Sequence, residues 1–360
     1  MDFFELLRFS IGAVDDVTIP QDTDWEAMHE MAKKQSLLGV IYQGIIKLPK
    51  EQRPERRLLL KWFAQSETIK VKNETVNGVA VRVSALFNQA GVENCILKGQ
   101  GNNVMYEDPY VRNPGDVDIW VNPQKLVFRD GWLLLGEKRM KVGKKSYHHV
   151  DAGSMDGISI EIHYRPCYMH NMIHNYRIQK WFAENAAKQF AHTVELPGDV
   201  GQISIPTMEF NLIYQLCHIS NHFFQEGIGL RQFVDYYYVL KNVKKETDLN
   251  VVRKWLKRFG LYKMASAVMY IEQEVLGLKK DQLIVTPNEK YGKFLLHEII
   301  MSGNFGQYDD RLGDFHRKTM LGHNMARLER DLRLIWLFPS ECLWEPVFRL
   351  YHYCWRKINS

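Results

Sequence analysis

Apolar positions in the first ninety residues recur at helical spacing. Thr23-Asp24-Trp25-Glu26 has the form of a capping box, which predicts that a helix begins there. Apolar side chains from Ala27 to Ile45 continue the helical stripe, and Pro49 and Pro54 end it. A second long helical pattern covers about residues 55 to 89. We therefore interpret residues 1–90 as an N-terminal helical region.

At Gly91 the helical spacing gives way to alternation. The apolar run Cys95–Leu97 ends in a glycine-containing turn at Lys98-Gly99. Residues 116–121 and 158–163 alternate polar and apolar side chains, as half-buried strands do. The other elements predicted in this region are a strand at 147–151, a short strand pair within 194–205, a helix at 124–137 and a basic hairpin loop around 138–145. Residues 91–205 are thus predicted to form a small mixed α/β core.

From Thr207 onward the apolar positions are helical again. Thr207 is a suitable N-cap, and Ile213, Leu216 and Cys217 mark one face of the helix that follows. Later helices are predicted at 230–240, 251–259, 265–275, 291–301, 324–336 and 343–357. The fold class expected is α+β: a small mixed sheet flanked by the helical regions 1–90 and 206–360.

Composition and charge indicate which cellular compartment and which partners to expect. The chain of 360 residues is 46% apolar and 25% charged, as in ordinary globular proteins. Its net charge of +5 permits a nucleotide or RNA partner without requiring one. The five cysteines show no C-x-x-C spacing, which favours reduced thiols. No signal peptide and no apolar run long enough for a membrane span is recognised, so we expect a cytoplasmic protein without a membrane partner.

Two carboxylates define the candidate chemistry. Asp116 and Asp118 project from the same face of their predicted strand, and Val117, Ile119 and Val121 take the other face. Two adjacent carboxylates repel each other, and a hard divalent cation such as Mg²⁺ compensates them. A lone D-x-D fits two solvated acids equally well, so the interpretation depends on other residues.

Three further features favour a metal and phosphate site. Glu161 and His163 share the polar face of the strand 158–163, so Glu161 completes a three-carboxylate cluster if the two strands are neighbours. His163 then either supports a metal-binding carboxylate or is a buried structural histidine. Lys98-Gly99 lets backbone amides and an ammonium group approach a phosphate, and Arg112 adds a second phosphate-binding cation; a plain turn and a surface arginine are the alternatives.

The combination of these motifs resembles the uncharacterised bacterial nucleotidyltransferase family of the DNA polymerase β-like superfamily. The resemblance rests on Lys98-Gly99, Arg112, Asp116-Val117-Asp118-Ile119 and Glu161-Ile162-His163. It continues through His218, His222, Leu230-Arg231 and Asp235, and more loosely to Phe338-Pro339-Ser340-Glu341. It covers about residues 25 to 240.

This resemblance implies an enzyme. A nucleoside monophosphate would pass from a nucleoside triphosphate (NTP) to an acceptor hydroxyl or phosphate, with Mg²⁺, or Mn²⁺ as the alternative ion, on Asp116, Asp118 and Glu161. The acceptor is left open among a small molecule, a protein and a tRNA, and so is the oligomeric state. The chain departs from the superfamily at Gln100, where a serine usually follows the glycine, and Gln100 is still predicted to bind the nucleotide together with Lys98, Gly99 and Arg112. A catalytically inactive module that binds nucleotide, RNA or protein is therefore the alternative function.

Downstream polar residues have two interpretations each. His218 and His222 lie four residues apart on one helix face, as a packed structural pair or as part of the nucleotide pocket. Arg231 and Asp235 are spaced as a helical ion pair. A structural role and a role in the nucleotide pocket are equally compatible with this spacing.

Overall fold

The computed structural model describes residues 2–309, 311 and 319–359, which cluster into two compact units. The first unit comprises the described residues of Met1–Val71, Tyr110–Asn113 and His218–Pro339. The second comprises Lys72–Pro109, Pro114–Cys217 and the described residues of Ser340–Ser360. Each unit is therefore built from segments that are distant in sequence. The division into 1–90, 91–205 and 206–360 remains a proposal about the order of elements along the chain.

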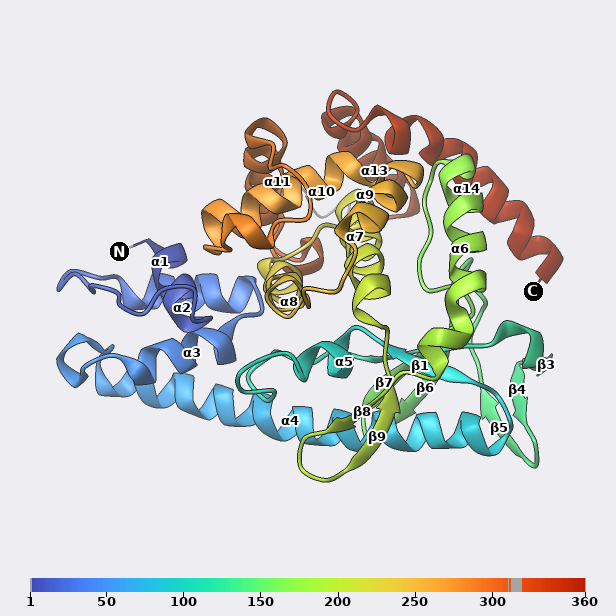
Figure 1. Cartoon of the computed structure of the whole chain (residues 1–360), viewed down its shortest axis with the longest axis horizontal. Coiled ribbons are helices and arrows are strands. Elements are labelled where there is room, and N and C mark those ends of the chain that lie inside the picture. The colour runs from blue at the N-terminus through green and yellow to red at the C-terminus, as the bar shows by residue number, and fades with distance from the viewer. Residues whose placement is uncertain (1, 310, 312–318, 360) are drawn as a thin grey trace. The chain divides into compact units, whose positions relative to one another are not determined.

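The first unit is helical. Its helices, labelled in Figure 1, are α1 (Phe3–Ser10), α2 (Trp25–Lys34), α3 (Leu38–Lys47), the N-terminal part of α4 (Arg56–Gln89), the C-terminal part of α7 (Met208–Gln225), α8 (Leu230–Lys241), α9 (Leu249–Arg258), α10 (Tyr262–Tyr270), α11 (Glu289–Ser302) and α13 (Met320–Leu334). Short helical turns are η1 (Lys50–Gln52), η3 (Ile271–Val275), η4 (Lys280–Gln282) and η5 (Asn304–Gly306). Among the residues that the structure describes, no helix has the length and apolar character of a membrane span.

The helix predicted after Thr23 is confirmed, but its cap is a different residue. Asp24 Oδ1 accepts a hydrogen bond from the Ala27 amide at 2.9 Å, whereas the Thr23 hydroxyl donates to the Pro20 carbonyl. Asp and Thr are both good N-caps, and the local backbone path selects between them. Helix α1 was not predicted from the sequence; its own capping box joins Asp2 and Glu5.

A buried glutamate lies in the π-helical turn η3. Glu272 has no exposed surface, and neither carboxyl oxygen has a hydrogen-bond partner among the described residues. Burial raises the pKa of Glu272 well above its ordinary value. The folded chain therefore keeps a proton on this carboxyl at pH values where the unfolded chain releases it.

We expect Glu272→Met to stabilise the first unit, because it replaces an unpaired buried polar group with an apolar one. Since the folded pKa lies above the unfolded pKa, Glu272 costs the wild type stability as pH rises above about 4.5, by up to about 1.4 kcal/mol per pH unit until the folded pKa is reached. Denaturant unfolding should show a larger gain for the variant at pH 8 than at pH 5. Glu274→Met, at an exposed position of the same turn, is the control. Equal gains at both pH values would contradict the argument.

The second unit is built on a four-stranded mixed sheet. The strand order is β1 (Asn94–Leu97), β2 (Val117–Val121), β7 (Ile158–His163) and β6 (His149–Met155). β2 and β7 are parallel, and the two outer pairs are antiparallel. The unit also contains the strands β3 (Val127–Arg129), β4 (Trp132–Leu135), β5 (Lys138–Lys141), β8 (Thr193–Leu196) and β9 (Gly201–Ser204), the turn η2 (Pro123–Lys125), and the helices α5 (Gly99–Asn103), α6 (Met172–Phe190) and α14 (Pro339–Asn359).

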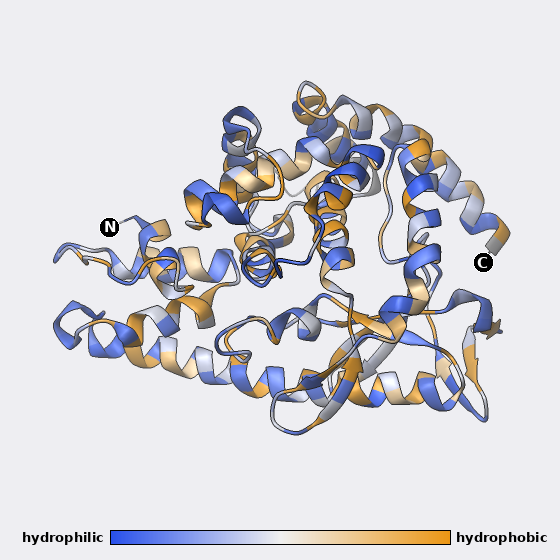
Figure 2. Ribbon diagram, viewed as in Figure 1, coloured by the Kyte–Doolittle hydropathy of each residue, from blue (hydrophilic) through white to orange (hydrophobic). Residues whose placement is uncertain are grey.

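One face of the sheet forms the core of this unit. Ile119 and Ile162 pack in one buried cluster with Val79 and Val83 of α4. Figure 1 shows α4 along one side of the sheet and α6 on the other, and Figure 2 shows apolar residues on the strands beside α4. Because side chains alternate along a strand, the residues directly before and after each of these isoleucines face away from α4. The predicted α+β fold, a small mixed sheet flanked by helices, is confirmed.

The helix predicted at 124–137 is wrong. These residues form η2, β3 and β4, and the basic run predicted as a loop supplies strand β5 from Lys138 to Lys141. Asp130, Gly131 and Gly136 adopt positive φ, which breaks a helix and permits tight turns, while Leu133 and Leu135 are buried on one face. Helix α6 was missed; Asn171 Oδ1 caps it by accepting from the Ile173 and His174 amides.

Candidate functional site

Strand register brings Asp118 and Glu161 together. Asp118 on β2 pairs with Glu161 on the parallel strand β7, and with Leu97 on β1 at its other side. Directly paired residues place their side chains on the same face, here the one opposite α4. Ligand atoms of Asp118, Glu161 and His163 all lie within 4.8 Å of one another. The sheet therefore unites the acids of two sequence motifs that are more than forty residues apart.

Both oxygens of Asp118 contact basic side chains. Lys98 Nζ lies 3.0 Å from Oδ2, and His163 Nε2 donates to Oδ1 at 2.8 Å. His163 Nε2 also lies 3.3 Å from Glu161 Oε2. The side chains of Asp118 and His163 are each only 4% exposed, whereas that of Glu161 is 27% exposed. Glu161 is thus the more accessible of the two paired acids.

These contacts oppose the effect of burial on the pKa of each group. Burial alone would raise the pKa of Asp118, but the contacts with Lys98 and His163 outweigh the effect of burial and lower this pKa. Burial would likewise lower the pKa of His163, but its hydrogen bonds to Asp118 and Glu161 raise it to about 9. The pKa of Lys98 is also raised, since the nearby carboxylates outweigh its burial. The cluster therefore consists of carboxylates neutralised by an ammonium and an imidazolium group.

Asp116 lies just before β2 and is exposed. The negative charge of Asp118 is the largest cause of a raised pKa for Asp116, with a smaller contribution from Glu161. Asp116 therefore adds a third carboxylate to the electrostatic environment of the cluster, at its solvent-accessible end.

The chain turns sharply at Lys98 and Gly99. Both residues have positive φ, of 50° and 39°, and a lysine in this region is uncommon. The turn directs the chain into α5, where Gln100 is buried and its amide donates to the side chain of Asn77 on α4. Gln100, predicted to bind the nucleotide, thus has its side chain in the interior of the unit.

Two histidines that were not predicted as site residues adjoin the cluster. His149 on β6 pairs with His163, and its Nδ1 lies 3.8 Å from Glu161 Oε2. His148 Nε2 lies 2.9 Å from His149 Nδ1. The sequence signal was a His-His pair within the strand predicted at 147–151, but its proximity to Glu161 depends on how the strands pair.

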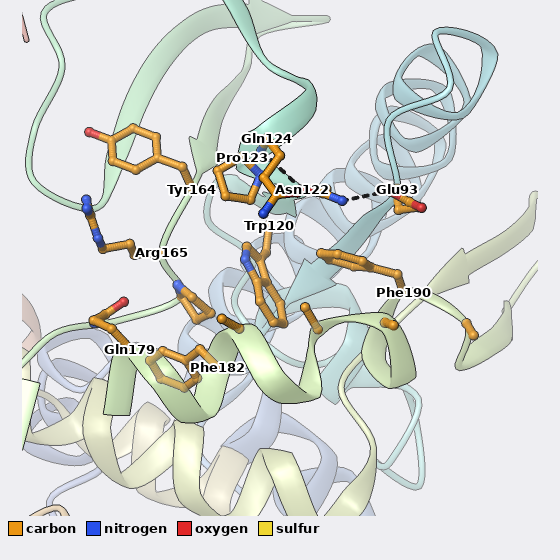
Figure 3. A pocket seen from close by; sticks show the side chains of 15 residues that line it. Glu93, Trp120, Asn122, Pro123, Gln124, Tyr164, Arg165, Gln179, Phe182 and Phe190 are labelled. Carbon is orange, nitrogen blue, oxygen red and sulfur yellow. Dashed lines mark hydrogen bonds between the residues drawn. The ribbon is translucent and has the colours of Figure 1, made fainter. Parts of the chain in front are cut away.

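A cavity of about 680 Å³ opens on the same face of the sheet. Trp120, two residues after Asp118, lines it together with Phe182 and Phe190 of α6, as Figure 3 shows. The volume is in the range of small-molecule pockets. The guanidinium group of Arg165, at its rim, donates to the Tyr147 carbonyl. The aromatic lining suits a planar or apolar group better than a triphosphate.

The other predicted binding residues belong to the first unit. Arg112 forms a bidentate ion pair with Asp235, at 2.6 and 2.8 Å, and both are buried. Arg231 donates to the Asn113 carbonyl, and the ring of His218 lies edge-on to that of His222. The structure brings Arg112 and Asp235 together. A role in a nucleotide pocket stays a prediction for both of them and for Arg231, His218 and His222.

Comparison with known proteins adds one finding. The model of the family described as "Uncharacterised nucleotidyltransferase" matches residues 21–277. No curated protein and no solved structure matches the chain. The match covers more than half of the chain and includes the strand motifs with Asp116, Asp118 and Glu161. The chain therefore belongs to the uncharacterised nucleotidyltransferase family.

Proposed function

We propose that the protein transfers a nucleoside monophosphate from an NTP to an acceptor hydroxyl or phosphate, with a divalent metal ion on Asp116, Asp118 and Glu161. The observation that carries the proposal is the pairing of Asp118 with Glu161 on parallel strands, beside Lys98. Family membership supports nucleotidyl transfer as the reaction class. Mg²⁺ is the proposed ion, with Mn²⁺ as the alternative.

The paired carboxylates of Asp118 and Glu161, whose ligand atoms lie within 4.8 Å of each other, fit a hard cation. Carboxylate oxygens are the ligands that Mg²⁺ prefers, and it commonly takes one or two of them together with substrate phosphates. The raised pKa of Asp116 shows that its charge is opposed by that of Asp118, and a divalent ion relieves such repulsion. Bound there, the ion would neutralise charge on the phosphate oxygens during transfer.

The protein's own residues have separate roles in this proposal. Lys98, fixed against Asp118, supplies a positive charge for phosphate. His163 holds the Asp118 carboxylate in one orientation. Glu161, which is more exposed than its strand partner Asp118, is the candidate base for an acceptor hydroxyl.

A second candidate function is a nucleotidyltransferase fold that binds its ligand without transfer. The side chain of Gln100 is buried and its amide donates to Asn77, so it is not free to bind a phosphate in place of a serine hydroxyl. Superfamily enzymes usually carry at this place a serine whose hydroxyl helps to hold the triphosphate. In the first function the nucleoside monophosphate leaves the triphosphate for an acceptor. In the second the triphosphate is bound but stays intact.

Replacing Asp116 or Asp118 by alanine tests the metal site. We expect both variants to lose Mg²⁺-dependent NTP binding, because each removes a proposed oxygen ligand. Equilibrium binding of each labelled NTP would be measured with Mg²⁺ and with chelator. Asp156→Ala, at an exposed position in the β6–β7 turn of the same unit, is the control. Equal Mg²⁺-dependent binding by wild type and both site variants would exclude the metal site.

Incubation with labelled NTP and cell extract separates transfer from binding and identifies the acceptor class. Label recovered on a small molecule, a protein or a tRNA supports transfer, provided that Asp118→Ala abolishes it. Retained binding without label on any acceptor in extracts of the source cells favours the binding module.

A further inference from the structure

Three imidazole rings gather where strand β6 begins. The ring centroids lie 4.3 Å apart for His148 and His149, 5.2 Å for His149 and His163, and 5.4 Å for His148 and His163. Each ring offers a nitrogen within 4.8 Å of one from each of the other two. The three rings therefore form a compact triangle rather than a row along one strand.

The triangle has the dimensions of a tris-imidazole metal site. With zinc–nitrogen bonds of about 2.0–2.1 Å and tetrahedral angles, the ring centroids of three histidine ligands lie about 5 Å apart. Two of the three separations observed match this spacing, and the third is shorter. Closing the remaining difference requires side-chain rotation of His148 or His149, both of which are half-buried.

The backbone that carries these histidines is held firmly. The His148 carbonyl accepts from the amides of Tyr164 and Arg165, at 3.0 and 3.1 Å. The His149 carbonyl accepts from the Ser146 amide and from the Tyr164 hydroxyl. Adjacent residues of a regular strand would point to opposite faces, but His148 precedes the first residue of β6. This position allows both rings to lie beside His163.

His163 has one ring nitrogen engaged and one without a partner. Nε2 contacts Asp118 and Glu161, whereas Nδ1 is buried and has no hydrogen-bond partner among the described residues. Histidines that bind metals commonly keep one ring nitrogen on a carboxylate while the other binds the ion, so an ion bound at Nδ1 would displace the proton of the imidazolium. Glu161 Oε2, 3.8 Å from His149 Nδ1, is an available oxygen at the border of the triangle.

Ligand chemistry distinguishes this triangle from the carboxylate cluster. Imidazole nitrogen suits Zn²⁺, Co²⁺, Ni²⁺ and Cu²⁺, whereas carboxylate oxygen suits Mg²⁺ and Mn²⁺. We propose that His148, His149 and His163 form a nitrogen-donor site for a borderline divalent cation of the Zn²⁺ class, next to the carboxylates. This site goes beyond the proposed function, since it requires neither a nucleotide nor transfer.

Cobalt binding to the full chain tests the site, since Co²⁺ replaces Zn²⁺ and its visible absorption reports coordination. The chain is first freed of metal with a chelator and then titrated with Co²⁺. Zn²⁺ is added last to displace the bound Co²⁺ and abolish its visible absorption. We expect one equivalent of Co²⁺ to bind with visible bands, and His148→Ala or His149→Ala to weaken its affinity at least about 10-fold. His174→Ala, which removes another half-buried histidine of the second unit, should leave the affinity unchanged.

Circular dichroism establishes that each variant folds, and His148→Gln replaces His148→Ala if the alanine variant does not. Co²⁺ affinity that is the same in wild type and in both alanine variants overturns the proposal, as does the lack of visible bands in the wild type. Asp116→Asn separates it from the proposed function, because this change should remove nucleotide transfer but retain Co²⁺ binding. Histidine-dependent Co²⁺ binding in a chain that transfers no nucleotide would support this site and contradict the proposed function.

Discussion

Glu161→Gln is expected to lower nucleotide transfer by about 10²–10³-fold, the range found when one transition-state-stabilising group is removed from an active site. Glutamine keeps the size of the side chain and an oxygen, but it has no charge to hold a divalent ion. Glu161 is paired with Asp118 in the sheet and is 27% exposed, so it is the acid of this pair that is more available to both metal and substrate. The measurement is Mg²⁺-dependent transfer of label from NTP in cell extract.

The same change should leave the fold intact. The carboxylate of Glu161 is partly exposed, and Ile160 and Ile162 on either side supply the buried contacts of β7. Glu195→Gln, at an exposed position on strand β8, is the control for replacing a strand glutamate in this unit. Transfer by Glu161→Gln at the wild-type rate would remove Glu161 from the three-carboxylate site and leave Asp116 and Asp118 without their predicted partner.

Asp235→Asn is expected to destabilise the first unit by about 3–5 kcal/mol, the usual effect of removing one partner of a buried ion pair. Asp235 accepts two charge-assisted hydrogen bonds from Arg112, and these residues are 3% and 4% exposed. Asparagine has one oxygen and no charge, so it leaves the guanidinium cation buried without its counter-ion. Denaturant unfolding of the full chain gives the difference in unfolding free energy.

An exposed ion pair in the same unit provides the comparison. Glu289 and Lys293 are four residues apart on α11 and largely solvated, so Glu289→Gln should leave the unfolding midpoint unchanged. Equal stability of Asp235→Asn and wild type would show that Asp235 does not hold Arg112 in the core. Asp235 would then be available for the pocket role that its sequence pattern also predicted.

Local patterns were sufficient for much of the fold. The alternation at 116–121 and 158–163 predicted two core-backed strands, because the two-residue period of a strand is a property of the backbone itself. The long pattern at 55–89 predicted α4 closely. The same approach failed at 124–137, where the apolar run Trp132–Leu135 fits a helix as well as a strand of a buried hairpin. Positive φ at Asp130 and Gly131 decides between them.

By itself, the sequence determined that Asp116 and Asp118 point to one side of a strand and that Glu161 and His163 do the same on another. Only the tertiary structure decided that these strands are parallel neighbours in a register that pairs Asp118 with Glu161, and that β6 adds His148 and His149. Register and strand order depend on contacts between segments far apart in the chain, and no local period encodes them. The same holds for Arg112, whose partner Asp235 lies 123 residues away.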